Sequence, residues 1–298
     1  MTTNIQFDMQ RRIVSHMTTK SWNTIPHVSY LYEPDITDFY NAYENFNHIS
    51  SKKISFNTIM LRTIVEGIKK APSLNATLAY HPKKIQGILT LHENINISLP
   101  WLLPDGKMIT PVIVHTEDKT LSSLSSSISE MKEKISHTNI NELLYKAALQ
   151  DTIAELKKMH VGILRRILAA QLGPQRIKGL SGKEKVKYYN SAEMHLSSKN
   201  LTSGTVTISN IGSIYKEQTG CFALLEIIPP QVFAVGLGAI QEKPGVYIND
   251  DGVKTIGIRK TLPMCLAFDH RAVDFSSLLP FLKTMDQIFQ SPDIIHSW

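Results

Sequence analysis

The stretch Pro263–Pro280, PMCLAFDHRAVDFSSLLP, carries the pattern that decides the fold. Its apolar run MCLAF predicts a buried strand. Asp269, His270 and Arg271 follow at once, and we expect the strand to carry the imidazole into the protein, where water is scarce. Asp274 begins a helical pattern, where a carboxylate can cap the helix. Because histidine is the commonest general base near neutral pH, this stretch predicts an acid–base site, although His-x-x-x-Asp alone is a weak motif.

Outward from this stretch, helical and extended patterns alternate along the chain. Helical periodicity or helix stop signals mark the segments 9–22, 37–46, 56–71, a stretch from about 118, and 275–289. Strand-like runs follow Pro26, fill much of 75–114, and return after residue 204 as GTVTISN, CFALLEI, QVFAVGLGAI, GVYIN and VKTIGIRK. This order predicts an α/β (α+β) sandwich, in which helices flank a large mixed sheet.

The composition is that of a folded protein with a substantial core. The chain has 298 residues, of which 42% are hydrophobic and 19% charged, so disorder is not expected. The net charge of +6 suits a polyanionic ligand such as the phosphates of coenzyme A, and equally suits a solvated surface. No segment shows the aromatic and basic pattern of a nucleic-acid binder.

Cysteine usage and hydropathy argue against a disulfide-rich, metal-binding, membrane-spanning or secreted protein. Cys221 and Cys265 both lie in apolar segments and are predicted to be buried, with no disulfide framework and no metal site. The segment 221–240 is about as long as a membrane span, but Glu226 and Pro229-Pro230 interrupt it. Two buried strands joined by a turn are therefore predicted. The polar first residues lack a secretory pattern, so we expect a cytoplasmic protein without a membrane segment.

Four ordered segments resemble one protein family. They are QRRIVSHMTTKSWNTIPHVSYLYEPDIT (10–37), LSSKNLTSGTVTISNIGSI (196–214), IIPPQVFAVGLGAI (227–240) and FDHRAVD (268–274). In these segments the chain resembles the catalytic domain of the E2 acyltransferases (dihydrolipoamide acyltransferases) of 2-oxo acid dehydrogenase complexes, in the chloramphenicol acetyltransferase-like superfamily. The resemblance implies the chloramphenicol acetyltransferase-like fold and the transfer of an acyl group between coenzyme A and a thiol.

The resemblance also assigns roles to residues. His270 is expected to act as the general base that removes the proton of the attacking thiol. Ser209, at the end of the strand GTVTIS, is expected to donate a hydrogen bond to the tetrahedral oxyanion, with Ser213 as the weaker candidate. Asn210 is expected to support the serine loop. A buried histidine and a serine that merely ends a strand are the structural alternatives.

Asp274 has two compatible interpretations. The resemblance implies that it orders the site through an arginine near the amino terminus, which makes Arg11 and Arg12 the candidate partners. Alternatively, Asp274 only caps the following helix. The spacing does not choose between the two arginines.

The chain departs from the family pattern in three places. Phe275 stands where the family signature has glycine, so the pocket must be lined or narrowed by a phenylalanine. The mainly helical segment 138–194 is interpreted as an insertion in a single catalytic domain that spans 1–298. Its apolar stripe is expected to pack against its own subunit, while docking of a partner, covering of the substrate channel and lying on a membrane stay open. We also expect that no lipoyl domain, peripheral-subunit-binding domain or linker precedes the domain.

Together these features predict a CoA-dependent acyltransferase without a metal. Coenzyme A or acyl-CoA is the expected substrate, and a lipoyl group is expected only in trans, on a lipoyl- or acyl-carrier-bearing protein or as a small molecule. The resemblance implies a homotrimer or a larger assembly of trimers, whose active sites lie between neighbouring subunits. The alternative is a non-catalytic, E2-like core or scaffold subunit. A hydrolase fits less well, because the chain has no Gly-x-Ser-x-Gly motif.

Overall fold

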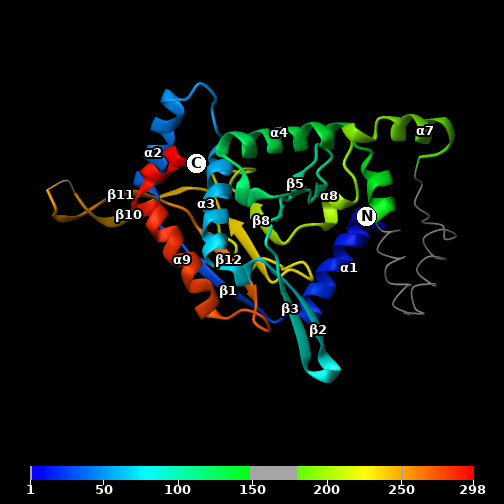
Figure 1. Cartoon of the computed structure of the whole chain (residues 1–298), viewed down its shortest axis with the longest axis horizontal. Coiled ribbons are helices and arrows are strands. Elements are labelled where there is room, and N and C mark those ends of the chain that lie inside the picture. The colour runs from blue at the N-terminus through cyan, green and yellow to red at the C-terminus, as the bar shows by residue number, and fades with distance from the viewer. Residues whose placement is uncertain (1, 148–179, 250) are drawn as a thin grey trace.

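A six-stranded sheet forms the centre of the computed structural model, which describes residues 2–147, 180–249 and 251–298 (Figure 1). The spatial order of its strands is β1 (His27–Tyr32), β12 (Met264–Asp269), β9 (Phe233–Leu237), β8 (Val206–Asn210), β4 (Ile97–Ser98) and β7 (Val112–Ile113). Strand β8 runs parallel to β4 and β9, and the other neighbours are antiparallel. The sheet is therefore mixed, as the sequence predicted.

The central strands are buried along their whole length. Every residue of β9 and β12 is buried, which agrees with their unbroken apolar sequences FAVGL and MCLAF. The last residue of β12, Asp269, differs from its apolar neighbours because it is charged, and its carboxylate lies in the core at 1% exposure. The predicted strand before the His270 turn is confirmed.

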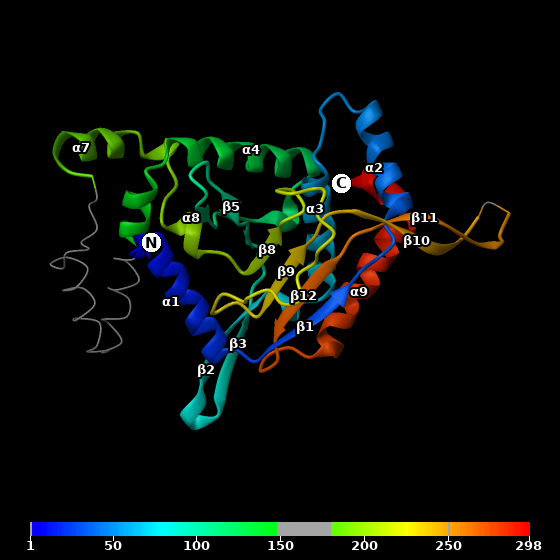
Figure 2. The ribbon, with the colours of Figure 1, turned by 180° about the vertical axis from the view of Figure 1, so that it is seen from behind.

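Helices cover one face of this sheet (Figures 1 and 2). They are α2 (Thr37–Ile49), α3 (Phe56–Lys70) and α9 (Phe275–Gln290), and α4 (Leu121–His137) lies beside α3. The side chains of Ser55, Thr120 and Asp274 cap the amino-terminal ends of α3, α4 and α9. Helices α3 and α9 approach closely at Gly67, where a Cβ atom would lie 2.6 Å from the ring of Phe281.

The irregular segment 211–230 crosses the opposite face of the sheet, and α1 (Met9–Thr24) lies to one side of the sheet (Figure 2). A Cβ atom at Gly236 would lie 2.6 Å from the ring of Phe222, so this segment lies directly on β9. Two predictions fail here. Residues 221–227 form no strand, because they lie across the sheet face instead of along an open edge, and Cys221 is exposed. Cys265 is buried, as predicted.

Three hairpins complete the β structure of the described residues. They are β2 (Ala76–His81) with β3 (Gln86–Leu91), β5 (Trp101–Leu102) with β6 (Met108–Ile109), and β10 (Gln241–Ile248) with β11 (Lys254–Thr261). The β2–β3 and β10–β11 hairpins project away from the body in both views (Figures 1 and 2). One face of β10–β11 carries exposed apolar side chains, among them Val246, Ile256 and Ile258.

The predicted insertion at 138–194 falls partly outside the described residues. Residues 140–147 are helical, and α7 (Gly182–Asn190) and α8 (Lys199–Thr202) follow the gap. Leu143 is buried, whereas the part of the apolar stripe at Ile153, Leu156 and Ile163–Leu168 lies outside the described residues. Short 3₁₀ turns occur at Pro72–Leu74, Pro82–Lys84, Thr116–Asp118, Ala192–Met194 and Pro292–Ser297. Among the described helices, none has the length and hydropathy that crossing a membrane requires.

Candidate functional site

The imidazole of His270 lies in the turn between β12 and α9 and is held through one nitrogen. Its Nδ1 lies 3.1 Å from the carbonyl oxygen of Val273, and its backbone N–H donates to the carbonyl of Pro26 over 3.1 Å. Because a carbonyl oxygen only accepts, Nδ1 carries the proton in this contact and Nε2 keeps its lone pair. His270 is exposed in the single subunit, so its predicted burial is wrong. The strand ends at Asp269, one residue too early to bury the ring.

A buried ion pair fixes the same turn. The carboxylate of Asp269 accepts from Nε of Arg271 over 2.9 Å and from Nη2 over 2.6 Å, and also from the Arg271 backbone N–H over 3.0 Å. The guanidinium of Arg271 lies over the ring of Tyr80 on β2, 5.1 Å from its centroid. We assigned no role to this pair from the sequence. Its signal is a carboxylate at the last position of an apolar strand, with an arginine two residues later.

The Ile-Pro-His turn at 25–27 lies directly beside His270. The ring of His27 contacts the carbonyl of Ile25 through Nδ1 at 2.9 Å, and its Nε2 accepts from the backbone N–H of Ile227 over 3.1 Å. Ser21 on α1 donates to the carbonyl of Ile227 over 2.7 Å. These bonds join α1, β1 and the segment 211–230 at the point where Pro26 receives the His270 N–H.

Asp274 caps α9, as the sequence predicted. It accepts from the backbone N–H of Ser277 over 3.2 Å, and the hydroxyl of Ser276 also donates to it. These hydrogen bonds, that of Ser276 first, lower the pKa of the carboxyl. Within the part of the chain that the structure describes, Asp274 has no arginine partner.

The candidate arginine partners of Asp274 lie elsewhere in the subunit. Arg11 and Arg12 are exposed in the first turn of α1. The His270 turn contacts the chain just beyond the other end of that helix, roughly 20 Å away at 1.5 Å per residue. An arginine–Asp274 pair would therefore need a second copy of the chain, and this pairing stays a prediction.

Ser209 is buried near the end of β8, before a tight loop. The side chain of Asn210 accepts from the Ser213 backbone N–H over 3.0 Å and donates to Oδ1 of Asn57 over 2.9 Å. The hydroxyl of Ser213 donates to the Asn210 carbonyl over 2.8 Å. A Cβ atom at Gly212 would lie 2.2 Å from the carbonyl oxygen of Gly238, so only glycine fits this loop.

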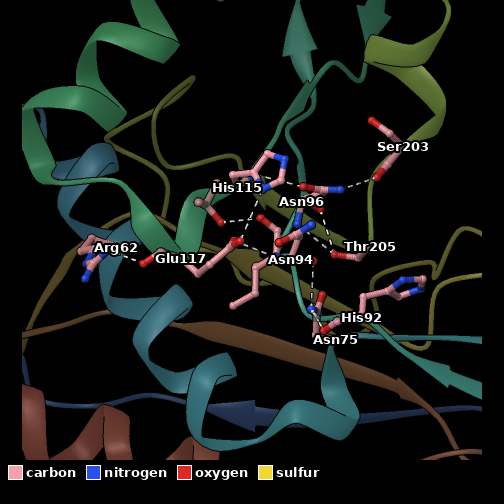
Figure 3. A network of polar contacts seen from close by, with 11 residues as sticks. Arg62, Asn75, His92, Asn94, Asn96, His115, Glu117, Ser203 and Thr205 are labelled. Carbon is pink, nitrogen blue, oxygen red and sulfur yellow. Dashed lines mark hydrogen bonds and ion pairs between the residues drawn. The ribbon is translucent and has the colours of Figure 1, made fainter.

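A network of polar contacts fixes the segment that leads into β8 (Figure 3). Asn96 donates to the carbonyl of Ser203 over 3.1 Å, and its backbone N–H donates to the hydroxyl of Thr205 over 3.0 Å. The side-chain oxygen of Asn96 accepts from the His115 N–H over 3.0 Å. Glu117 accepts from the backbone of Ile95 over 2.8 Å. The network therefore sets the start of the strand on which Ser209 lies, and we did not predict it from the sequence.

The register of the sheet places Ser209 and His270 at opposite ends. Ser209 lies opposite Gly236 on β9, and Gly236 lies opposite Cys265 on β12. His270 comes five residues after Cys265, which corresponds to about 17 Å along an extended strand. One subunit therefore does not bring its own serine and histidine together. If the two act in one reaction, they come from different copies of the chain.

Comparison with known proteins gives the family. Residues 2–144 and 176–296 match the family model described as the 2-oxoacid dehydrogenases acyltransferase (catalytic domain). The chain belongs to this family. The stretch 145–175 that the match leaves out lies inside the predicted insertion at 138–194, whose role stays a prediction.

Relatives and solved structures agree with this family. This acyltransferase domain is 22% identical over 288 residues to the dihydrolipoyllysine-residue acetyltransferase component of the pyruvate dehydrogenase complex of Staphylococcus epidermidis. The alignment covers 96% of this chain, and the chain spans only 50% of the length of that relative. It superposes on dihydrolipoamide acetyltransferase of Azotobacter vinelandii with a TM-score of 0.66 and 19% identity, covering 99% of this chain and 94% of that one.

A second solved structure has the same fold. A chain of the cubic core of the pyruvate dehydrogenase multienzyme complex superposes on this acyltransferase domain with a TM-score of 0.65 and 18% identity, over 99% of this chain and 94% of that one. Both likenesses confirm the predicted fold. The Azotobacter structure was determined to examine the roles of a serine, a histidine and an asparagine in the catalytic mechanism of that enzyme.

Proposed function

We propose that this domain transfers an acyl group between coenzyme A and the thiol of dihydrolipoamide. The observation that supports this most strongly is the His270 imidazole, whose Nδ1 is engaged by Val273 while Nε2 keeps a lone pair at the surface. A thiol with a pKa near 8.5 is mostly protonated at neutral pH, so a base at this position accelerates its attack.

The steps follow from that tautomer. Nε2 takes the proton of the attacking thiol, and its sulfur forms a bond to the carbonyl carbon of the thioester. The negative charge passes to the carbonyl oxygen, and the imidazolium is stabilised by the Val273 carbonyl. The oxyanion then collapses, the bond from carbon to the leaving sulfur breaks, and the imidazolium returns its proton to that sulfur. No covalent bond to the enzyme is formed.

We assign the oxyanion donor to Ser209 of a neighbouring copy. The separation of about 17 Å within one chain supports this assignment, because a hydroxyl must approach an oxyanion to about 3 Å to act. A homotrimer, or an assembly of such trimers, would place the two residues together at each of its interfaces. The cubic core among the structural neighbours supports this form of assembly.

The second thiol is proposed to reach the site from outside the domain. A lipoyl group on another polypeptide is the proposed partner, and an acyl-carrier protein or a small thiol would use the same chemistry. The basic balance of the chain, with a net charge of +6, supports a polyanionic co-substrate such as coenzyme A. The reaction needs no metal, and we place it in the cytoplasm.

The test is acyl transfer from a panel of acyl-CoAs to free dihydrolipoamide, by the wild type and His270→Ala side by side. We expect turnover in the wild type and a loss of about 10²- to 10⁴-fold in the variant. His27→Ala is the matched control for loss of an imidazole in the same region, since the His27 ring has both nitrogens engaged. Equal background rates in the wild type and His270→Ala would refute the proposal and favour the non-catalytic scaffold.

A further inference from the structure

Two aromatic rings lie exposed on the subunit near the His270 turn. Tyr30 on β1 and Phe275, the first residue of α9, have ring centroids 5.5 Å apart and an interplanar angle of 54°. Tyr30 is 36% exposed and Phe275 49% exposed. They contact each other but leave much of their apolar surface to solvent. Because the subunit leaves this apolar surface uncovered, it is available to bind an apolar group near the His270 turn.

The rings lie on the same side of the sheet as the imidazole. Val28 and Tyr32 lie two residues before and after Tyr30 on β1, so all three point to the same face, and Val28 and Tyr32 pack against the core beneath α9. Phe268 belongs to the same core, and its ring lies edge-on to that of His270, with centroids 5.9 Å apart. The face that carries the imidazole therefore also carries the aromatic pair.

The rings are also close to the imidazole along the chain. The carbonyl of Pro26 receives the His270 N–H, and Tyr30 lies four residues farther along, which is about 13 Å of extended strand. Phe275 follows the carbonyl of Val273, which holds the imidazole, by only two residues. In the proposed reaction the thioester carbon bonds to a sulfur within hydrogen-bond reach of Nε2. The acyl chain of the thioester must therefore begin beside this face.

We propose that Tyr30 and Phe275 form an apolar wall that binds the acyl chain, and that the domain thereby favours medium-length acyl groups over acetyl. This inference rests on the proposed acyl transfer and adds to it a residue pair that determines specificity. A chain that leaves the imidazole along β1 meets the ring of Phe275 and then that of Tyr30. Each methylene that it buries there strengthens binding about fourfold.

Binding of S-alkyl coenzyme A thioethers, from S-ethyl to S-octyl, tests the wall without any turnover. By calorimetry we expect the Kd of the wild type to fall by about fourfold per methylene, and that of Phe275→Gly to fall by less than about twofold. The Kd for S-ethyl coenzyme A should be the same in both. Phe275→Leu should keep the dependence on chain length, because it keeps an apolar side chain.

Ile256→Gly is the matched control, because Ile256 is an apolar residue that is 74% exposed on the β10–β11 hairpin, which has no part in the proposed site. It should bind the series like the wild type. Tighter binding of the longer thioethers by Phe275→Gly would overturn the proposal, since the ring would then narrow the pocket. A change in oligomeric mass in Phe275→Gly, with the chain-length dependence intact, would also overturn it and make the pair a subunit contact.

The same series in His270→Ala separates the two proposals. In one outcome, the Kd of this variant depends on chain length as in the wild type, but the wild type shows no turnover that depends on His270. The proposal of acyl transfer then fails and that of the apolar wall stands. If turnover depends on His270 but Kd does not depend on chain length, the wall fails and acyl transfer stands. Absence of thioether binding in the wild type overturns the wall.

Discussion

The charged residues around the His270 imidazole differ in how they are held. Asp274 is solvent-facing and caps a helix, whereas Asp269 is buried and bonded to Arg271 through both carboxylate oxygens. A buried carboxylate without its partner is costly, so the Asp269–Arg271 pair holds the turn in one conformation. We therefore regard Arg271 as a positioning residue for the imidazole, although it does not touch the ring.

Arg271→Gln tests this positioning. It leaves the Asp269 carboxylate buried and uncompensated, so the free energy of unfolding should fall by about 3–5 kcal/mol in urea titrations. The looser turn should also lower kcat by about 100-fold with a smaller effect on KM. The double variant Asp269→Asn with Arg271→Gln removes the unpaired charge and should recover much of the stability. A stable Arg271→Gln variant would contradict the role of the pair.

Ser209→Ala tests the oxyanion donor. Loss of one such donor typically costs about 10²- to 10³-fold in kcat with little change in KM, because the bond forms only as the oxyanion develops. Ser213→Ala is the control in the same loop, since the Ser213 hydroxyl already donates to the Asn210 carbonyl. Its kcat should stay close to that of the wild type. A large loss of kcat in Ser213→Ala with little loss in Ser209→Ala would assign the oxyanion donor to Ser213.

At the scale of elements, the β10–β11 hairpin is fastened at its base by charge. Nε of Arg259 donates to Asp35 over 2.6 Å, and Nη2 donates to Asp38 over 3.1 Å. Arg259 also lies over the ring of Tyr247, 4.5 Å from the centroid. An isolated two-stranded hairpin is marginally stable in water, so these contacts at its base help to join it to the body, together with the backbone bonds between Ile36 and Lys260 and between Leu262 and Pro34.

The pH dependence of stability should report this attachment. Burial raises the pKa of Asp35, but the hydrogen bonds from Thr37 and Arg259 outweigh it and leave the pKa below its usual value. The stabilisation is therefore complete above the pKa of the unfolded carboxyl, about 3.9, and is lost as the pH falls through the lower folded value. In urea titrations between neutral pH and acid, Asp35→Asn should lose less stability than the wild type. Parallel losses would show that Asp35 contributes nothing.

At the scale of the whole molecule, the sheet separates the proposed base from the proposed oxyanion donor. The antiparallel pairing of β12 with β9, and the parallel pairing of β9 with β8, send the ends of β12 and β8 in opposite directions. A single subunit thus offers a histidine at one end and a serine at the other. Activity would then be a property of the assembly.

Mixed assemblies test this directly. His270→Ala and Ser209→Ala should each be nearly inactive alone. Subunits unfolded together in equal amounts and refolded should regain about one quarter of the wild-type activity, because a quarter of the interfaces pair an intact histidine with an intact serine. Mixing the two variants without unfolding is the control and should restore none. If refolded mixtures have the oligomeric mass of the wild type but regain no activity, both residues act within the same subunit.

Local pattern alone determined much of this protein. Periodicity and capping residues predicted α1, α3 and α9 to within a few residues, since these signals are carried by neighbours in sequence. The four motifs likewise identified the family and the candidate residues His270 and Ser209. The apolar run 221–227 failed as a strand prediction, because an apolar segment packs equally well across a sheet as within one.

Only the tertiary structure decided which of these residues meet. Strand order and register depend on pairing between distant segments, and nothing in the spacing of Ser209 and His270 shows that they end at opposite edges of one sheet. The exposure of His270 follows from where β12 ends, and the Asp269–Arg271 pair from what surrounds that end. The sequence therefore names the candidate reacting groups, and the long-range pairing of strands keeps them apart within one subunit.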